Sequence, residues 1–588
     1  MWFKSSFTIP AVAAISFCLI GGTTPAVADI LHVPGDFPTI QAAIDAAMDR
    51  DEVEVHPGTY NETIDLLGKS ITVRSSDGAA VTTIDGGDLG ASVITCANGE
   101  GSDTIIQGFT ITGGEGTDFQ FPGQQINPVG GGLFCDGAGP TVQDCIFENN
   151  QLAFYGGGIF LINGSDPSIT DCTFTGNIAF SGAGILSVGS SPTITGCTFD
   201  ENWALGGDGG GIFFFEGGRG VVSECDFTNN FSCFGAGIFT YQSSPTVTDC
   251  TFSFNYTKVI GGGMYNWDST PVITRCTFES NIGNGILNTG SPAQITDCIF
   301  RDNMSFETGG VQNVDGSHAT ITNCAFLGNE GVICGGVSNT RSSATIVNCL
   351  FVGNSSNNTG AIYNFSFNDV TTQPAVINCT VIGNTGPVAG GIRSRDGLVT
   401  TTIINSIVRD NSSAQIADSD GAVSIVSYSN VEGGFIGNGN IDQDPLFVDP
   451  ENGDFRLSSG SPSIDAGNNW GVAVDELDYD EDGVLCELFP VDLDGNPRFN
   501  ADEADVDPGC GVPVVVDMGA YEYQFDPADQ VTFADLNGDN TVGAADLLGL
   551  LVSWGPCGKG CCLADFNLDG NVGASDLLTM LVNWGPCP

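Results

Sequence analysis

The chain has 588 residues and a formal net charge of −55, because 70 aspartates and glutamates outnumber only 15 lysines and arginines. A surface this acidic repels nucleic acid and anionic membranes, which excludes both as partners, and it favours a divalent cation such as Ca²⁺ as a ligand. Solubility alone would also explain part of the acidic excess.

The first 28 residues have the pattern of an export signal. Lys4 precedes an apolar run over residues 9–20, and small residues follow up to Ala28. A positive start, an apolar centre and a small-residue end are typical of secretory signal peptides. The pattern predicts cleavage near Ala28 and a mature protein that is secreted or held at the cell surface. No other stretch is long and apolar enough to predict a membrane span.

The segment from Val33 to Gly87 predicts a cap at the start of a larger fold. It contains an amphipathic helical pattern over residues 40–48 and strand patterns at residues 53–55 and 71–73. The open end of a stacked β fold exposes edge strands and an apolar core, and a helix laid across it would shield both.

A short phrase then returns every 22 to 30 residues between about Gly130 and Asn411, and it is clearest in SPTVTDCTFSFN, which begins at Ser244. Each unit holds two short β-branched or aromatic runs, separated by Gly, Pro, Ser and Asn, with no helical periodicity. One cysteine returns in every unit, followed five residues later by an asparagine. The cysteines are Cys145, Cys172, Cys197, Cys225, Cys250, Cys276, Cys298, Cys324, Cys349 and Cys379, and the asparagines are Asn150, Asn177, Asn202, Asn230, Asn255, Asn281, Asn303, Asn329, Asn354 and Asn384.

Units of this length predict a right-handed parallel β-helix, in which each coil stacks on the next at about 4.8 Å. Propeller blades are longer, and leucine-rich repeats carry leucine where this chain has Ile, Cys and Phe. We expect the Ile, Cys and Phe to fill the interior as ladders, and the Asn to lie at a turn where its amide bonds to the backbone and to neighbouring coils. The repeated cysteines are then buried thiols; disulfides between coils are the alternative, with a strained geometry.

The opening of the chain supports this fold through a resemblance. TIQAAIDAA, which begins at Thr39, is followed by PGTYNE, which begins at Pro57. This opening resembles that of the pectate-lyase-like β-helix superfamily, which implies the solenoid fold. The later catalytic phrases of its pectin methylesterases and main pectate lyase family have no counterpart here, so the resemblance implies no particular chemistry.

The glycine-led run of each unit predicts aromatic stripes on the outside of the solenoid. If Ile159, Ile212, Ile238, Met264 and Ile362 point inward, strand alternation places two sets of aromatic residues on the outer face. The first set is Phe160, Phe213, Phe239, Tyr265 and Tyr363, and the second is Phe215, Tyr241, Trp267 and Phe365. The candidate carbohydrate-binding residues are Tyr241, Tyr265, Trp267 and Tyr363, because exposed rings stack on sugars. The alternatives are that loops cover the rings or that inside and outside are reversed.

The same pattern places five asparagines on the inner side of this strand. They are Asn266, Asn288, Asn313, Asn339 and Asn364.

The catalytic candidates are few. Arg393, Arg395 and Asp396 would lie at one end of the same face, where β-helix lyases use an arginine base beside Ca²⁺-binding acids. Two arginines at this spacing are more often surface charge. His56 and His318 appear isolated, and no His/Cys spacing typical of a metal site is present. The sequence therefore names no active site.

After Asn411 the repeat fades and a closing segment is expected over residues 441–525. The stretches at residues 443–469, 492–500 and 517–523 resemble the closing segment of secreted bacterial β-helix proteins. Between them, Asp478, Asp480, Asp482 and Gly483 form half of a calcium loop, without an acid at the twelfth position.

The last stretch contains two twelve-residue loops, at residues 535–546 and 565–576, each followed by an apolar helical pattern. Both carry oxygen ligands at positions one, three, five and twelve, with a backbone carbonyl at position seven, as a hard cation requires. The predicted Ca²⁺ ligands are Asp535, Asn537, Asp539, Thr541 and Asp546 in the first loop and Asp565, Asn567, Asp569, Asn571 and Asp576 in the second. Aspartate-rich surface turns without metal are the alternative.

The pair of loops resembles a type I dockerin, the tandem Ca²⁺ module that docks secreted polysaccharide-degrading enzymes onto cohesins. The resemblance implies Ca²⁺ binding and a cohesin-like protein as a candidate partner. At positions ten and eleven, however, where recognition residues are often Ser-Thr, this chain has Ala544-Ala545 and Ala574-Ser575. Cys557, Cys561, Cys562 and Cys587 are expected to form disulfides, with three connectivities open.

The sequence thus predicts a signal peptide (1–28), an all-β right-handed parallel β-helix with a helical cap (29–440), a closing segment (441–525) and a small α-helical, dockerin-like module (526–588). Three functions are open. The first is a calcium-binding protein that binds polysaccharide and anchors through its last module. The second is a polysaccharide lyase or glycoside hydrolase, and the third is a structural matrix protein without glycan activity.

Overall fold

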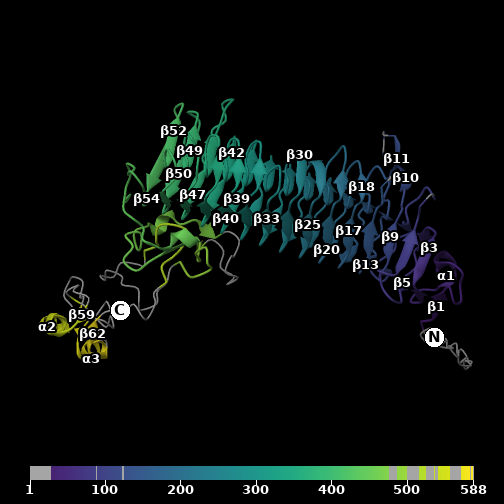
Figure 1. The fold of residues 1–588 in the computed structure, drawn as a ribbon, viewed down its shortest axis with the longest axis horizontal. Coiled ribbons are helices and arrows are strands. Elements are labelled where there is room, and N and C mark those ends of the chain that lie inside the picture. The colour runs from purple at the N-terminus through teal and green to yellow at the C-terminus, as the bar shows by residue number, and fades with distance from the viewer. Residues whose placement is uncertain are drawn as a thin grey trace, which may run out of the picture.

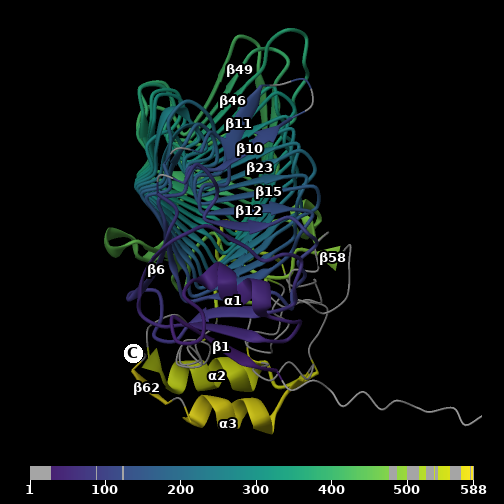
Figure 2. The same cartoon turned by 90° about the vertical axis from the view of Figure 1, so that its right-hand side faces the viewer.

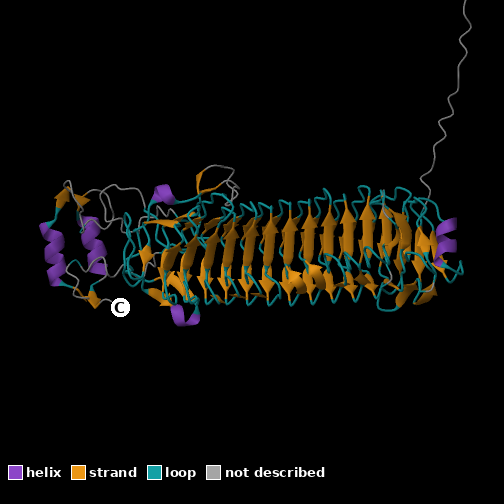
Figure 3. Cartoon of the chain, turned by 90° about the horizontal axis from the view of Figure 1, so that it is seen from above, coloured by secondary structure: helices purple, strands orange, loops and turns teal. Residues whose placement is uncertain are grey.

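The computed structural model describes residues 28–87, 89–121, 123, 125–151, 153–475, 487–498, 515–524, 536, 541–556, 564, 571–582 and 584–586. Residues 28 to 431 wind into a long solenoid in which three parallel sheets run side by side along the axis (Figures 1 and 3). Every coil contributes short strands, and each strand pairs with its equivalents in the coils before and after it. The expected parallel β-solenoid is therefore confirmed.

The first sheet has 16 strands. In spatial order they are β1 (Ile30–Val33), β2 (Glu52–Val55), β5 (Thr72–Ser75), β8 (Ile105–Gln107), β13 (Thr141–Gln143), β16 (Ser168–Thr170), β20 (Thr193–Thr195), β24 (Val221–Ser223), β28 (Thr246–Thr248), β32 (Val272–Thr274), β35 (Gln294–Thr296), β39 (Thr320–Thr322), β43 (Thr345–Val347), β47 (Ala375–Ile377), β50 (Thr400–Ile404) and β53 (Val423–Ser427).

The second sheet has 14 strands and contains the glycine-led runs. They are β4 (Ile64–Asp65), β7 (Ile94–Cys96), β12 (Leu133–Asp136), β15 (Ile159–Ile162), β19 (Ile185–Val188), β23 (Ile212–Phe215), β27 (Ile238–Tyr241), β31 (Met264–Trp267), β34 (Ile286–Thr289), β38 (Val311–Val314), β42 (Val337–Thr340), β46 (Ile362–Phe365), β49 (Ile392–Arg395) and β52 (Ile416–Ser419).

The third sheet has 15 strands. They are β3 (Gly58–Asn61), β6 (Thr82–Asp85), β9 (Thr110–Thr112), β14 (Ile146–Glu148), β17 (Thr173–Thr175), β21 (Thr198–Asp200), β25 (Asp226–Thr228), β29 (Thr251–Ser253), β33 (Thr277–Glu279), β36 (Ile299–Arg301), β40 (Ala325–Leu327), β44 (Leu350–Val352), β48 (Thr380–Ile382), β51 (Ile407–Arg409) and β54 (Asn430–Val431).

Short strands also form where the chain passes from the third sheet to the second, and we call these the arm strands. They are β18 (Ile178–Ala179), β22 (Trp203–Ala204), β26 (Phe231–Phe234) and β30 (Tyr256–Ile260) in one sheet, and β37 (Met304–Ser305), β41 (Glu330–Gly331) and β45 (Ser355–Ser356) in another. An antiparallel hairpin, β10 (Thr117–Gln120) with β11 (Ile126–Val129), projects from an earlier coil.

The N-terminal end is closed by α1 (Ile40–Ala46), which lies across the first coils (Figure 2). The Thr39 hydroxyl accepts a hydrogen bond from Ala42 N at 3.2 Å and caps the helix start. Lys69 Nζ donates to the carbonyls of Ile44 and Ala47 at the helix end. Ile40, Ala43 and Ile44 are buried on the core side, so the predicted cap is confirmed.

The interior is built from ladders of identical side chains. Nine phenylalanine rings of the third sheet stack from coil to coil, with centroids 4.6 to 5.0 Å apart and planes within 6°; they are Phe147, Phe174, Phe199, Phe227, Phe252, Phe278, Phe300, Phe326 and Phe351. The ten repeated cysteines form a second ladder of buried, free thiols, as expected. Burial raises the pKa of Cys298, Cys324 and Cys349 well above the usual range, which keeps these thiols protonated.

The repeated asparagines form a third ladder, from Asn150 to Asn411, that joins the coils by hydrogen bonds. In each coil the Nδ2 group donates to the Oδ1 atom of the next asparagine at 2.9 to 3.0 Å. From Asn177 onward, Nδ2 also donates to a backbone carbonyl of the preceding coil at 2.8 to 2.9 Å. The predicted turn asparagine is thus confirmed, and its buried amide is fully bonded.

Glycine directly precedes most second-sheet strands, because the coils approach closely there. A Cβ atom on Gly211 would lie 2.6 Å from the Gly237 carbonyl oxygen and 2.7 Å from the Phe227 ring. A larger residue at Gly211 would therefore push two coils apart.

The closing segment packs against the outer side of the third sheet near the C-terminal end of the solenoid. Its described elements are β55 (Phe447–Asp449), η1 (Pro450–Asn452), β56 (Asp454–Leu457), η2 (Asn469–Gly471), β57 (Val474–Asp475) and β58 (Glu487–Leu488). Phe455 is buried with Leu350 and Ile382 of the sheet. Arg498, fully buried, bonds to Glu522 at 3.1 Å and to the Asn348 side chain at 2.8 Å. The predicted half-loop of Asp478, Asp480 and Asp482 lies outside the described residues.

The described part of the C-terminal module contains α2 (Ala544–Val552) and α3 (Ala574–Val582). Its short strands pair reciprocally: β59 (Thr541–Val542) with β62 (Gly585–Pro586), and β60 (Gly555–Pro556) with β61 (Asn571–Val572). Val542, Leu550, Val572 and Met580 form the buried core between the two halves. No helix in the described part of the chain is both long and apolar enough to cross a membrane.

The asparagine ladder generates a stability prediction. Replacing Asn255 with Ala removes the Oδ1 acceptor of the Asn230 backbone N–H and of Asn230 Nδ2, and removes one of the two donors to Asn281 Oδ1, all in a buried turn. Unsatisfied buried groups cost about 1–3 kcal/mol each, so we expect the free energy of unfolding to fall by roughly 3 kcal/mol, measured by guanidinium denaturation. Asn357→Ala, at an exposed position of a nearby coil, is the matched control and should change little. Equal stability of the two variants would contradict a structural role of the ladder.

The closing segment generates a pH prediction. Burial raises the pKa of Asp517 to about 7, whereas an unfolded aspartate loses its proton near pH 4. Between these values the folded state holds a proton that the unfolded state has released. The contribution of Asp517 to the free energy of unfolding is therefore largest at the acidic end of this range and is lost as the pH rises through about 7. We expect the thermal midpoint to be lower at pH 8 than at pH 5.5, measured calorimetrically in saturating Ca²⁺. Asp517→Asn, which cannot titrate, should reduce this difference; an unchanged difference would contradict the assignment.

Candidate functional site

The outer face of the second sheet carries two rows of side chains that run along the solenoid. Strand register aligns the first outer row as Phe134, Phe160, Leu186, Phe213, Phe239, Tyr265, Leu287, Gln312, Ser338, Tyr363 and Arg393. The second outer row, two residues further along each strand, includes Phe215, Tyr241, Trp267, Thr289, Val314, Thr340, Phe365 and Arg395. The expected outward orientation of the aromatic residues is therefore right.

The N-terminal half of the first outer row is covered, which corrects the expectation of an exposed stripe. Phe119 and Phe121 of the β10–β11 hairpin contact the Phe160 ring with centroids 6.0 and 6.1 Å away. Phe234 of β26 covers Tyr265 at 6.0 Å, and Tyr265 is only 6% exposed. Apolar side chains on a sheet face recruit a cover because their burial is favourable.

The candidate carbohydrate-binding residues are thus divided. Tyr265 lies under the arm strands, Tyr241 is half-buried beside Trp267, and Trp267 itself is 42% exposed. Tyr363 is 5% exposed, yet its ring lies at the floor of an open cleft further along the same face.

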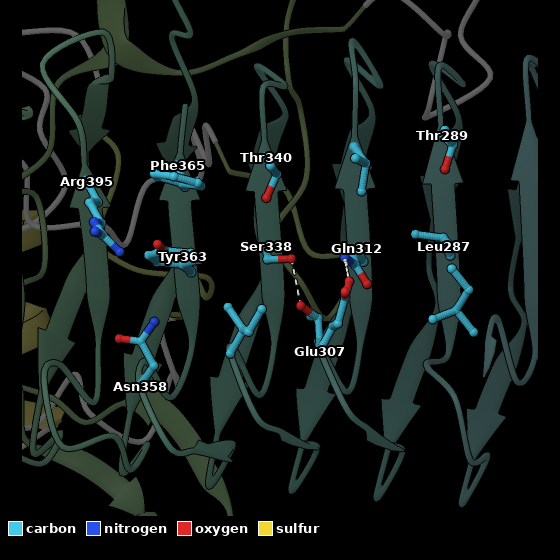
Figure 4. A pocket seen from close by; sticks show the side chains of 14 residues that line it. Leu287, Thr289, Glu307, Gln312, Ser338, Thr340, Asn358, Tyr363, Phe365 and Arg395 are labelled. Atoms are coloured by element: carbon cyan, nitrogen blue, oxygen red, sulfur yellow. Dashed lines mark hydrogen bonds between the residues drawn. The ribbon is translucent and has the colours of Figure 1, made fainter. Parts of the chain in front are cut away.

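This cleft opens where the outer rows change from apolar to polar residues, over β34 to β49 (Figure 4). Its volume is about 530 Å³. It is lined by Ile260, Leu287, Thr289, Glu307, Thr308, Gln312, Val314, Ile333, Ser338, Thr340, Asn358, Tyr363, Phe365 and Arg395. The second-sheet strands provide the floor, and the segments between the third and second sheets provide one wall.

A short coil lies at the N-terminal edge of the cleft. Four residues separate Asn281 from β34, against eight between Asn255 and β31, and among the described residues this coil forms only isolated bridges from Ile282 to Tyr256 and Met304. Leu287 is still only 1% exposed and packs with Ile260 of the preceding coil, so the cleft opens beyond it, over the polar part of the outer rows.

Two arginines lie over aromatic rings at the C-terminal end of the cleft. The Arg395 guanidinium lies 5.4 Å from the Phe365 ring centroid, and Nε donates to Asp420 Oδ2 at 2.8 Å. The hydrogen bond to Asp420 raises the pKa of Arg395, which stays charged. Arg393 lies 5.6 Å from the Tyr363 ring and donates to the Asn358 side chain. Arginine stacked on a ring keeps N–H groups available for an acceptor in the cleft.

The middle of the cleft is polar and internally bonded. Glu307 is the single carboxylate among the lining residues, and its Oε2 accepts a hydrogen bond from Gln312 Nε2. Thr308 and Ser338 share a hydrogen bond of 2.6 Å between their hydroxyls, and Figure 4 shows the Glu307, Gln312 and Ser338 side chains on the cleft surface. Thr308, Gln312 and Ser338 are at most 6% exposed, so the half-buried Glu307 carboxylate is the group of this set that a ligand in the cleft can reach.

The three catalytic candidates do not form one cluster. Arg393 and Arg395 lie beside and within the cleft, but Asp396 occupies the turn after β49 with φ 83°, where Oδ1 accepts from Leu398 N at 3.2 Å. Its carboxylate serves the turn, while the arginines bond to Asn358 and Asp420 instead. A catalytic role of Arg393, Arg395 and Asp396 stays a prediction.

An inner asparagine ladder holds the floor of the cleft rigid. Asn266, Asn288, Asn313, Asn339 and Asn364 point inward as predicted, and their amides bond in series at 2.9 Å before ending on the Thr401 hydroxyl. A fully bonded buried network fixes the strand register, and hence the spacing of side chains on the outer face.

A row of exposed aromatic residues on the arm strands was not predicted from the sequence. Trp203 and Tyr256 of the arm strands are 46% and 44% exposed, and the Phe231 ring stacks on Tyr256 at 5.6 Å. Lys258 Nζ lies 5.3 Å from the Phe231 ring centroid. We call Trp203, Phe231 and Tyr256 the arm row. Each residue directly follows a ladder asparagine, so the repeat itself contained the signal.

Of the predicted calcium ligands, the structure describes those at positions seven and twelve of each loop. Asp546 Oδ2 accepts from Gly543 N at 2.8 Å, and Asp576 Oδ2 accepts from Gly573 N at 2.7 Å. Both carboxylates are buried, and Thr541 and Asn571 lie in the paired strands β59 and β61. The other predicted ligands, Asp535, Asn537, Asp539, Asp565, Asn567 and Asp569, lie outside the described residues, as do Cys557, Cys561, Cys562, Cys587 and the signal segment 1–27.

Comparison with known proteins agrees with the architecture. Residues 68–191 and 131–300 match the family model "Right handed beta helix region", so the solenoid is a right-handed parallel β-helix. A comparison with curated protein sequences yields no match.

Solved structures with distant similarity include the following three. A pectin methylesterase in complex with a hexasaccharide is 12% identical over 45% of this chain and 89% of its own, with a TM-score of 0.27. Tailspike protein 3 of bacteriophage CBA120 is 11% identical over 70% of this chain and 60% of its own, with a TM-score of 0.32. A mannuronic acid specific polysaccharide family 6 lyase from human gut microbiota is 11% identical over 64% of this chain and 86% of its own, with a TM-score of 0.30. Similarity at this level carries no information on the ligand of this chain.

Proposed function

We propose that this chain is a secreted, calcium-binding β-helix protein that binds extracellular or cell-surface polysaccharide in the cleft over β34 to β49. The observation that carries the proposal is the composition of the cleft. It combines the half-buried Phe365 ring, the hydroxyl and amide groups of Thr289, Thr340 and Asn358, and the Arg395 guanidinium along one open face. Sugars present many hydroxyls that such donors and acceptors can bind, and apolar patches that a ring can contact.

The shape of the floor supports an extended ligand. Successive coils place equivalent side chains at the spacing of adjacent strands, about 4.8 Å, so the same kind of contact is repeated along the solenoid. A chain molecule with repeated units can use several such contacts at once.

The alternative is a polysaccharide lyase or glycoside hydrolase. It is favoured by one observation, that the Glu307 carboxylate and Arg395 line the same cleft. A carboxylate beside bound sugar is the group that such chemistry requires. The appearance of new reducing or unsaturated ends would distinguish an enzyme from a protein that only binds polysaccharide.

For the C-terminal module we propose two Ca²⁺ sites and docking to a cohesin-like protein. The buried Asp546 and Asp576 carboxylates occupy equivalent places at the start of α2 and α3, and the predicted ligands are all oxygens, which fits Ca²⁺. A bound Ca²⁺ would neutralise these carboxylates and hold the loops against the helices.

Binding in the cleft can be tested with the double variant Arg395→Ala and Phe365→Ala. Both side chains point outward, so the fold should persist while a ring face and a cationic donor are lost. On a panel of neutral and acidic polysaccharides, we expect retention of the purified mature chain and at least a tenfold weaker affinity of the variant. The supernatants are assayed for new reducing or unsaturated ends.

The control is the double variant Trp203→Ala and Tyr256→Ala in the arm row, which should bind like the unmodified chain. Loss of binding in this control alone would move the site to the arm row, and absence of binding to any polysaccharide would overturn the proposal. New ends that disappear in Glu307→Gln would establish the enzymatic alternative.

The calcium proposal predicts a stoichiometry. Isothermal titration of chelator-treated protein with Ca²⁺ should show one ion fewer in Asp546→Ala and one fewer in Asp576→Ala than in the unmodified chain. Asp410→Ala, in a turn of the solenoid far from these loops in sequence, should retain the full number. Unchanged stoichiometry in both loop variants would contradict the assignment.

A further inference from the structure

Two of the three histidines in the chain come together at the N-terminal end of the first sheet. His32 lies on β1 and Glu54 is its register partner on β2, while His56 follows two residues after Glu54. Val33, Val53 and Val55 are buried in the core, so strand alternation places His32, Glu54 and His56 together on the outer face. The isolation of His56 inferred from sequence is therefore wrong, because coil stacking brings His32 beside it.

The three side chains face one another closely. His32 Nδ1 lies 3.1 Å from Glu54 Oε1, the two imidazole rings have centroids 5.8 Å apart, and one ligand atom from each residue lies within 4.8 Å of the others. A tetrahedral Zn²⁺ with bonds of about 2.0–2.1 Å needs ligand separations of about 3.3 Å. His32 is part-buried and His56 exposed, so the ligand atoms would move closer together by side-chain rotation when the ion binds.

Neighbouring charged groups hold the Glu54 carboxylate in a position where it can bind a metal ion. Arg74 binds Glu54 through Oε2 and also donates to Glu52 Oε1 at 2.5 Å. Arg74 therefore fixes Glu54 so that Oε1 faces His32. The nearby charges remain acidic overall, because Glu52, Glu54, Asp36 and Asp77 outnumber Arg74. An acidic surround attracts a cation.

The ligand types select the metal. Two imidazoles and one carboxylate form the donor set of open zinc sites, in which water takes the fourth position. Imidazole nitrogen suits Zn²⁺ and similar transition ions, whereas Ca²⁺ requires six or more oxygens. The site is thus chemically distinct from the oxygen loops of the C-terminal module.

We propose that His32, Glu54 and His56 bind a divalent transition ion, with Zn²⁺ as the reference, and that this ion ties the edge strand β1 to β2. β1 is the terminal strand of the first sheet and pairs with one neighbour only. Such edge strands open most easily. A metal with one ligand on β1 and two on the next coil closes the end of the solenoid against fraying.

The test is Zn²⁺ titration of the untagged mature chain, stripped with chelator and resupplied with saturating Ca²⁺. We expect one high-affinity Zn²⁺ per chain, an affinity at least tenfold lower in His32→Ala and in His56→Ala, and loss of the site in the double variant. His318→Ala removes the third histidine, which bonds to Ser343 N elsewhere, and should leave Zn²⁺ binding unchanged. His32→Gln keeps a polar side chain of similar size and guards against a folding artefact.

Hydrogen exchange gives a readout of the structural role. Zn²⁺ should slow amide exchange in residues 30–33 of the unmodified chain by at least tenfold and have no such effect in the double variant. Zn²⁺ affinity that is equal in the unmodified chain and the double variant, or bound Zn²⁺ without protection of residues 30–33, would overturn the proposal. The experiment involves no polysaccharide, so its outcome is independent of the cleft.

Discussion

The structure depends on one constraint, which is that every coil must turn at the same place with its backbone and side-chain amides buried. The asparagine ladder meets it, because each Oδ1 accepts from the next-lower coil while each Nδ2 donates to the coil above and to a carbonyl below. Unbonded amides at this depth would be costly. The bonds also fix the coils in register, and the Phe and Cys ladders then stack on identical partners. The buried thiols occupy a space that needs a small apolar group, and burial raises the pKa of Cys324 and Cys349, which keeps these two neutral there.

Once the turn is fixed, the coils still vary in the segment between the ladder asparagine and the second sheet. In some coils this segment forms an arm strand, and in the short coil after Asn281 it forms none. Covered and open parts of the same outer face differ in their outer-row side chains, which change from Tyr265 and Leu287 to Gln312 and Ser338. The floor beneath the cleft stays rigid, because the inner ladder from Asn266 to Asn364 continues through both parts.

The repeat predicted the solenoid, the three ladders and the inward or outward direction of the second-sheet side chains, because each depends on spacing within one coil. The amphipathic pattern before the repeat predicted the helical cap. Exposure could not be predicted in the same way. Tyr265 and Trp267 differ by two residues and share a face, yet Tyr265 lies under Phe234 from a different part of the coil. The cover comes from Phe234 of β26 and from Phe119 and Phe121 of the β10–β11 hairpin, which are not part of the repeated phrase. The contact of Asp396 could not be predicted for a related reason, since a turn geometry that sequence does not reveal directs its carboxylate to the backbone.

The His32, Glu54 and His56 cluster also depends on how the coils stack, and not on spacing within one coil. Spacing rules for metal sites assume ligands close in sequence, whereas a solenoid brings residues one coil apart within hydrogen-bonding distance at every rung. His32 and Glu54 are 22 residues apart and their side chains meet at 3.1 Å. In a stacked fold, each candidate ligand therefore has its neighbour one coil later in the sequence. On the outer faces of this chain, such neighbours are arginines over aromatic rings at one end of the solenoid and imidazoles beside a carboxylate at the other.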